Sequence, residues 1–191
     1  MNLANKITIA RIILIPFFIA SVIYSRLDIA LVIFICAVIS DGLDGFIART
    51  MNQKTFLGTV LDPVADKLLL MSTFIVLAVS KSIPAGARLP AYVPIIVISR
   101  DALIVLGTVI IYFIAGDVKI EPSGYGKVTT FFQMMTIVSV LVHFRYSYVI
   151  WTIAIIFTAI SGIDYLIKGS RMLNNNHAPQ KKRQGEATWQ R

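Results

Sequence analysis

Six apolar segments account for most of the sequence and limit what the chain can fold into. A helix needs about 20 apolar residues to cross the hydrocarbon core of a membrane. A segment in lipid must also satisfy its backbone hydrogen bonds without water, which leaves helices or closed barrels. The composition agrees, since 57% of the residues are hydrophobic and the mean hydropathy is +0.77. The sequence therefore predicts an all-α fold, a polytopic membrane protein built as a six-transmembrane-helix bundle, with spans over residues 7–24, 29–48, 56–79, 91–115, 128–143 and 148–167.

The spans leave no room for a separate soluble domain, so we expect one transmembrane domain over residues 1–170. Residues 171–191 are polar and basic and offer no apolar face. Such a segment cannot bury enough apolar surface to fold, and we expect a disordered cytoplasmic tail. A signal peptide is the competing interpretation of residues 7–24, but Arg11 would interrupt its apolar region.

Lysine and arginine are unevenly divided between the two ends of the predicted spans. Positive residues gather in the cytoplasmic loops of membrane proteins, which here assigns both termini to the cytoplasm and predicts a multi-pass protein of the cytoplasmic membrane. The net charge of +8 then favours membrane lipids and anionic substrates as partners, and argues against nucleic acid. The cations on the predicted cytoplasmic side are Lys6, Arg11, Arg49, Lys54, Lys119, Lys127, Lys168, Arg171, Lys181, Lys182, Arg183 and Arg191, against Arg26, Lys81, Arg88 and Arg145 on the other.

Four acidic residues, Asp41, Asp44, Asp62 and Asp66, fall inside the second and third predicted spans. A carboxylate at the centre of a span costs roughly 2.5 to 3.5 kcal/mol on insertion scales, so a compensating cation is expected. At helical periodicity the first two share one arc, and the last two lie one turn apart. Two facing helices would bring all four together, and carboxylate oxygens suit Mg²⁺ or Mn²⁺. The sequence therefore predicts a metal site at the cytoplasmic ends of these two helices.

The same stretch carries a longer pattern, Asp-x-x-Asp-Gly-x-x-Ala-Arg, eight residues, then Gly-x-x-x-Asp-x-x-x-Asp. At every position it resembles the signature of the CDP-alcohol phosphatidyltransferases, membrane enzymes of phospholipid synthesis. The resemblance implies that Asp66 is the general base, and that two metal ions on Asp41, Asp44, Asp62 and Asp66 bind the diphosphate of CDP-diacylglycerol. It also implies that the nucleotide and its diphosphate are held at Gly45, Ala48, Arg49 and Gly58.

Three basic residues elsewhere, Arg11, Arg100 and Lys127, are candidates to bind a phosphate on the acceptor alcohol, because Arg and Lys are the usual phosphate ligands. Short patterns in the sequence resemble those of the bacterial phosphatidylglycerolphosphate synthases of that family. The resemblance implies transfer of the phosphatidyl group from CDP-diacylglycerol to glycerol 3-phosphate, which releases CMP and forms phosphatidylglycerol phosphate. The patterns are Asn5-x-x-Thr8-x-x-Arg11, Gly126-Lys127-x-x-Thr130, LDPVADK at Asp62 and SGIDYLIKG near the last span.

Two questions stay open at this point, the acceptor and the class of protein. Arg100 is followed by Asp101 where those synthases commonly have Glu, and an Arg-Asp pair resembles the cardiolipin synthases of the same family, which use phosphatidylglycerol. The pair is equally interpreted as a buried ion pair that only holds helices together. A cation transporter, a protein of another class, would explain the intramembrane carboxylates. It would not explain Gly45, Ala48, Arg49 and Gly58. A homodimer is common in the family that the sequence resembles, although no interface is legible in the sequence.

Overall fold

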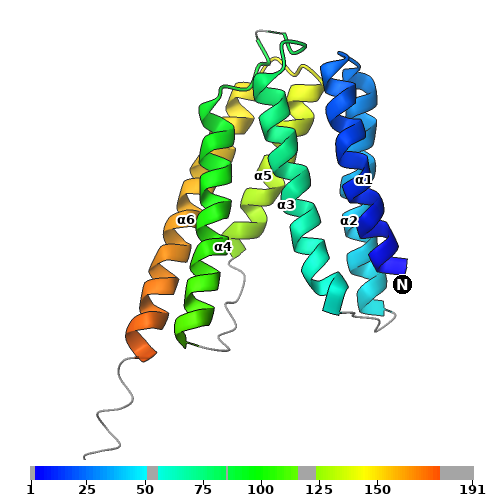
Figure 1. The fold of residues 1–191 in the computed structure, drawn as a ribbon. Coiled ribbons are helices and arrows are strands. Elements are labelled where there is room, and N and C mark those ends of the chain that lie inside the picture. Colours follow the sequence, from blue (N-terminus) through cyan, green and yellow to red (C-terminus); the bar gives the residue numbers. More distant parts are fainter. Residues whose placement is uncertain (1–2, 51–55, 85, 116–123, 177–191) are drawn as a thin grey trace, which may run out of the picture. The chain divides into compact units, whose positions relative to one another are not determined.

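The computed structural model describes residues 3–50, 56–84, 86–115 and 124–176 (Figure 1). The regular structure across these residues is helical, which confirms the all-α prediction. Each helix contains most of one predicted apolar span, because a helix satisfies its own backbone hydrogen bonds. The helices are α1 (Leu3–Ile23), α2 (Leu27–Thr50), α3 (Phe56–Val79), α4 (Tyr92–Ala115), α5 (Gly124–Leu141) and α6 (Ser147–Asn176). The part of the predicted tail from residue 177 onward lies outside the described residues.

Four helices extend beyond the predicted spans into polar sequence. α1 begins at Leu3 instead of residue 7, and α2 covers Leu27–Thr50 instead of residues 29–48. α5 begins at Gly124, before the predicted start at residue 128, and α6 runs to Asn176, into the segment predicted to be disordered. An ion pair one turn long, between Lys168 Nζ and Asp164 Oδ2 at 2.8 Å, supports the last part of α6. Apolar length indicates where a helix crosses lipid, but backbone hydrogen bonds and local ion pairs continue the helix past that point.

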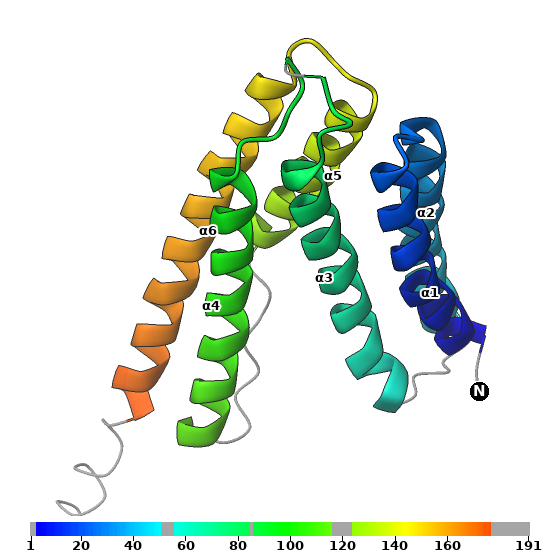
Figure 2. The same cartoon turned by 45° about the horizontal axis from the view of Figure 1, so that its top comes forward.

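The chain divides into two compact units, the first of which contains Met1–Ile95 and Phe131–Ala154. In this unit α1 and α2 form an antiparallel hairpin (Figure 1, Figure 2), and α1 also contacts α3. Phe18 and Phe34 pack between the two helices of the hairpin, with ring centroids 6.2 Å apart and no exposed surface. Arg11 and Asp41 lie two helical turns from these rings, so the same helix faces bring them together.

Residues in the left-handed conformation end α1 and α5. Ser25 has a φ of 59° and His143 a φ of 57°. After Ser25, the amide of Arg26 donates a hydrogen bond to the carbonyl of Ser21 at 2.8 Å, and the same pattern follows His143. This Schellman arrangement satisfies carbonyls that the helix end leaves open. The chain can therefore reverse within a few residues between α1 and α2, and between α5 and α6.

The second unit contains Ile96–Thr130 and Ile155–Arg191. In it α4 and α6 run parallel, side by side (Figure 1, Figure 2), and the Thr108 and Tyr165 hydroxyls form a hydrogen bond of 2.7 Å between them. A Cβ atom on Gly107 would lie 2.8 Å from the ring of Tyr165, so this close approach requires glycine. α5 joins the same unit where Thr129 Oγ1 donates to the carbonyl of Phe157 on α6 at 3.0 Å.

Large apolar side chains are exposed along α4 and α6. In water an apolar surface of this extent is unfavourable, whereas lipid accommodates it. Within the described residues two helices are long and apolar enough to cross a membrane, over Tyr92–Val109 and Ser147–Ser170, and α1 contains a shorter apolar stretch, Ile7–Ile23. The exposed side chains include Leu103, Leu106 and Val109 on α4, and Ile160, Ile163, Leu166 and Ile167 on α6.

Candidate active site

The eight positions of the acidic pattern lie in the last three turns of α2 and the first three turns of α3. The one-turn spacing on which the metal prediction depends is therefore present in the backbone. The structure describes the side chains of Asp41 and Asp66 among them; those of Asp44, Gly45, Ala48, Arg49, Gly58 and Asp62 lie outside the described residues. Among the described side chains, no three His, Cys, Asp or Glu residues are grouped. The cluster of four carboxylates stays a prediction.

An ion pair connects α1 to the first acid of the pattern. Arg11 Nη1 lies 2.7 Å from Asp41 Oδ1, and the arginine side chain has no exposed surface. Thr8, one turn earlier on α1, is also fully buried. Because α1 contacts both α2 and α3, the helix that carries Arg11 packs against both helices that carry the acids.

Burial differs sharply between the two partners of this ion pair. The Asp41 side chain is 39% exposed, against 0% for Arg11. A buried guanidinium requires its counter-ion, and breaking a buried pair by removing one partner costs about 3 to 5 kcal/mol. Asp41 is thus held through one oxygen while part of its carboxylate stays open to a further ligand. The sequence made Arg11 a candidate for the acceptor's phosphate, which stays a prediction, and the structure shows that it pairs with a predicted metal ligand.

Asp66, the predicted general base, lies on α3 and has a half-buried side chain. The next residue, Lys67, is also half-buried. The residue before this pair, Ala65, is buried, and the next turn brings Leu69 and Leu70 into the core. One side of α3 is therefore anchored by apolar packing at the level of Asp66. Such anchoring is what a carboxylate needs to keep a constant position while it exchanges a proton.

In the second unit, Arg100 lies at the centre of a buried polar group. Its Nη1 donates to Asp101 Oδ1 at 2.6 Å, and its Nη2 donates to the hydroxyl of Ser161 on α6. Arg100 is 8% exposed and Asp101 2%. In the described part of the chain Arg100 Nε has no hydrogen-bond partner. Ser161 was not predicted as a site residue, although it begins the SGIDYLIKG run that the sequence singles out.

The guanidinium of Arg100 is also close to the start of α5. A Cβ atom on Gly126 would lie 3.5 Å from Arg100 Nη2, and one on Gly162 would lie 3.6 Å from Arg100 Cγ. Both are ordinary contact distances, so the two glycines flank the arginine without clashing. Lys127, the residue after Gly126, has an exposed side chain. Arg100 and Lys127, two of the three predicted phosphate ligands, therefore belong to neighbouring segments of one unit. Both segments lie near the N-terminus of α5, and a helix N-terminus favours anions.

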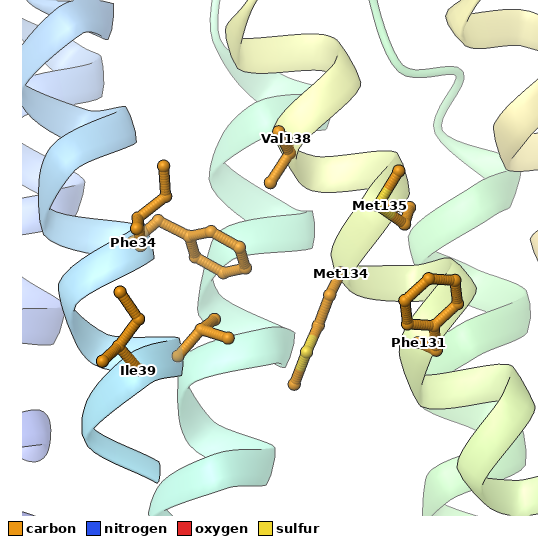
Figure 3. A pocket seen from close by; sticks show the side chains of 8 residues that line it. Phe34, Ile39, Phe131, Met134, Met135 and Val138 are labelled. Atoms are coloured by element: carbon orange, nitrogen blue, oxygen red, sulfur yellow. The ribbon is translucent and has the colours of Figure 1, made fainter. Parts of the chain in front are cut away.

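An apolar pocket of about 230 Å³ lies between α2 and α5 in the first unit (Figure 3). The α2 wall ends at Ile39, two residues before Asp41. Hydrocarbon is the chemistry that such a lining accepts, since it offers no hydrogen-bonding side chain. Side chains from the two helices line the pocket from opposite sides: Phe34, Ile35, Val38 and Ile39 from α2, and Phe131, Met134, Met135 and Val138 from α5.

Comparison with known proteins gives matches over most of the chain. Residues 1–160 match the model of the CDP-alcohol phosphatidyltransferase family. A protein of Aquifex aeolicus named CDP-diacylglycerol--glycerol-3-phosphate 3-phosphatidyltransferase is 32% identical, with 91% of this chain and 98% of the relative aligned. The Haemophilus influenzae protein of the same name is 36% identical, with 91% and 97% aligned. Human cardiolipin synthase (CMP-forming) is 28% identical, with 89% of this chain and 62% of the relative aligned.

These matches extend over both units of the structure and over the whole acidic pattern of α2 and α3. Identity above 30% across nine-tenths of both proteins reflects common ancestry and not a shared short motif. The resemblance first noted in eight residues therefore holds for the chain as a whole. The chain belongs to the CDP-alcohol phosphatidyltransferase family and is a phosphatidyltransferase.

Proposed function

We propose that this enzyme transfers the phosphatidyl group of CDP-diacylglycerol to glycerol 3-phosphate. An acceptor hydroxyl oxygen forms a bond to the phosphorus that carries diacylglycerol. The bond from that phosphorus to the CMP oxygen breaks, and CMP leaves as phosphatidylglycerol phosphate forms. The observation that carries this proposal is the near full-length match to relatives named for that reaction. The apolar pocket beside Asp41 supports a donor with hydrocarbon chains.

The acidic residues of α2 and α3 would bind two divalent metal ions, either Mg²⁺ or Mn²⁺. The described residues fit this role in their chemistry, because Asp41 is a hard oxygen donor, held on one side by Arg11 and open on the other. When bound, such ions neutralise a diphosphate and stabilise charge on the attacking and leaving oxygens. We assign Asp41, Asp44, Asp62 and Asp66 as the ligands.

We assign the remaining residues of the pattern to the nucleotide and to proton transfer. Asp66 accepts the proton of the acceptor hydroxyl as the new bond forms. Arg49 binds the nucleotide or its diphosphate, and Gly45, Ala48 and Gly58 leave space for it against the helix backbone. A purified Asp66→Asn variant should keep CDP-diacylglycerol binding and lose turnover. Near-normal turnover in that variant would remove Asp66 from the role of base.

The acceptor's phosphate is assigned to Arg100 and Lys127. Their support is the position of the Arg100 guanidinium beside Gly126, the residue before Lys127, and the exposed lysine side chain. Arg11, the third candidate from the sequence, stays a candidate for this phosphate, and it also pairs with Asp41. Lys127→Ala should raise the KM of the acceptor more than the KM of CDP-diacylglycerol. An unchanged acceptor KM would assign Lys127 to the solvated end of the helix.

For the membrane we propose six spans with both termini in the cytoplasm, one transmembrane domain over residues 1–170 and a disordered basic end to the tail. The uneven distribution of Lys and Arg supports this orientation. A homodimer is proposed by analogy with the family alone. Cysteine accessibility in oriented vesicles checks the topology, since a cysteine placed in the tail should react only from the cytoplasmic side.

The test of the function is CMP release by the purified protein with CDP-diacylglycerol and Mg²⁺, with glycerol 3-phosphate and phosphatidylglycerol offered separately. Release with glycerol 3-phosphate alone is the expected result. Release with phosphatidylglycerol alone would establish the second candidate, a cardiolipin synthase, which the Arg100-Asp101 pair and the human relative favour. Family membership favours a transferase over a cation transporter, and cation flux without CMP production would reverse that order.

A further inference from the structure

Polar side chains occupy the buried face of α5. Thr129, Gln133 and Thr136 have no exposed surface, although α5 is one of the predicted membrane spans. Both threonines use a carbonyl of their own helix: Thr129 Oγ1 donates to Tyr125 and Thr136 Oγ1 to Phe132, each at 2.8 Å. A threonine can satisfy its hydroxyl in this way inside a helix. Gln133 therefore has to be explained separately.

The carboxamide of Gln133 is buried, and its hydrogen bonding differs from that of the two threonines. Within the described part of the chain neither Nε2 nor Oε1 has a partner. A buried polar group without a partner is unfavourable anywhere in a protein and more so in a lipid environment, where no water can replace the missing bond. A group that offers a donor and an acceptor side by side is complementary to a hydroxyl, which can accept from Nε2 and donate to Oε1.

Gln133 lies about one helical turn from the level of Asp41. The pocket of Figure 3 places α2 and α5 side by side in the first unit, so their levels can be compared. Asp41 lies two residues beyond Ile39 towards the end of α2, and Gln133 lies two residues beyond Phe131 away from the start of α5, so their levels differ by about 6 Å of helix rise. The pocket pairs Ile39 with the start of its α5 wall and Phe34 with the far end of that wall, as expected for antiparallel helices.

We propose that the carboxamide of Gln133 is a binding site for a hydroxyl group inside the first unit. The hydroxyl belongs either to a polyol acceptor, whose non-reacting hydroxyl would be recognised beside the reacting one, or to a bound water molecule. Gln133 has no exposed surface in this structure, so the bound group enters by parting the packing around α5. Binding of an acceptor hydroxyl rests on the proposed function, whereas binding of a water molecule does not.

The experiment compares wild type with Gln133→Met, which keeps the length of the side chain and removes the amide. Met134→Leu is the matched control, because Met134 is the next residue and lines the apolar pocket instead. Two acceptors are used, glycerol 3-phosphate and 3-hydroxypropyl phosphate, which keeps the reacting hydroxyl and the phosphate and lacks the second hydroxyl. The measurements are kcat/KM for each acceptor from CMP release, and the Tm of each purified variant.

For an acceptor hydroxyl, the preference for glycerol 3-phosphate over the deoxy analogue should fall by about three- to tenfold in Gln133→Met, the value of one hydrogen bond, and stay unchanged in the control. If the amide binds water, Gln133→Met should keep the preference for glycerol 3-phosphate over the deoxy analogue, and its Tm should be no higher than that of wild type. An unchanged preference with a raised Tm would overturn the proposal, because only an unsatisfied amide is improved by removal. If wild type releases CMP with neither acceptor, the proposed function fails, and the Tm comparison still decides whether the amide binds water.

Discussion

Two Arg-Asp ion pairs with a buried arginine, one in each unit, differ in whether the aspartate is exposed. Arg11 and Asp41 come from different helices, and the aspartate is 39% exposed while the arginine is enclosed. Arg100 and Asp101 are neighbours on α4, with side chains 9% and 2% exposed. The first pair leaves a carboxylate accessible to a ligand, whereas the second encloses both charges and directs the guanidinium towards Ser161 and the start of α5. The same two residue types thus suit a cation in one unit and an anion in the other.

The largest effect is expected from Asp41→Asn. It removes a proposed metal ligand and the carboxylate charge that pairs with the buried Arg11, so kcat should fall by more than about a hundredfold. Stability should fall as well, by up to about 3 to 5 kcal/mol. CMP release and the midpoint of thermal unfolding measure the two effects. Activity within a few-fold of wild type would show that the open carboxylate of the first pair holds no metal.

Arg100→Lys tests whether the second pair recognises the acceptor. Lysine keeps the charge but cannot reach Asp101 and Ser161 with a planar fork. We expect about a tenfold rise in the KM of glycerol 3-phosphate, with the KM of CDP-diacylglycerol unchanged. Ser161→Ala, which removes a single hydrogen bond, should give a smaller change in the same direction. A lower Tm with both KM values unchanged would make the pair a purely structural contact.

Gly107→Ala perturbs the second unit without touching either ion pair. The added methyl would meet the Tyr165 ring at 2.8 Å, and overpacking of this kind costs about 1 to 3 kcal/mol. Because α4 and α6 carry Arg100 and Ser161, the acceptor KM should rise modestly while the dependence of activity on Mg²⁺ concentration stays unchanged. The control is Gly86→Ala, where an added Cβ would meet nothing within 4 Å. A shifted Mg²⁺ dependence in Gly107→Ala would mean that the second unit also affects the metal.

The smallest effect is expected from Asp28→Asn, which breaks an exposed pair. Arg26 Nε lies 3.6 Å from Asp28 Oδ1, with side chains 62% and 71% exposed. Surface pairs contribute about 0 to 1 kcal/mol, so stability and turnover should stay close to wild type. A stability loss as large as that of Asp41→Asn would mean that burial does not separate these ion pairs.

Much of the fold could be predicted from local sequence. Each apolar segment predicted one helix. The start of α1, both ends of α2, the start of α5 and the end of α6 lie up to nine residues beyond the predicted spans, because polar residues also continue a helix. The positions of Asp41 and Asp66 on α2 and α3 followed from their spacing. The partners of Arg11, Arg100 and Gln133 could not be predicted, since these depend on which helix faces which. For Arg11 the sequence offered a role as one of three candidates for the acceptor phosphate, and the packing that brings Phe18 against Phe34 adds an ion pair with Asp41 that the sequence did not predict.

By itself the sequence determined that the chain forms apolar helices and that two of them carry a patterned set of acids, because helical hydrogen bonds and side-chain periodicity are local properties. The eight-residue pattern was also enough to indicate the family. Only the tertiary structure decided that Arg11 pairs with Asp41, that Arg100 reaches Ser161 from 61 residues away, and that Gln133 is enclosed with no hydrogen-bond partner among the described residues. These contacts join residues far apart in the chain, and the packing of apolar helix faces selects them.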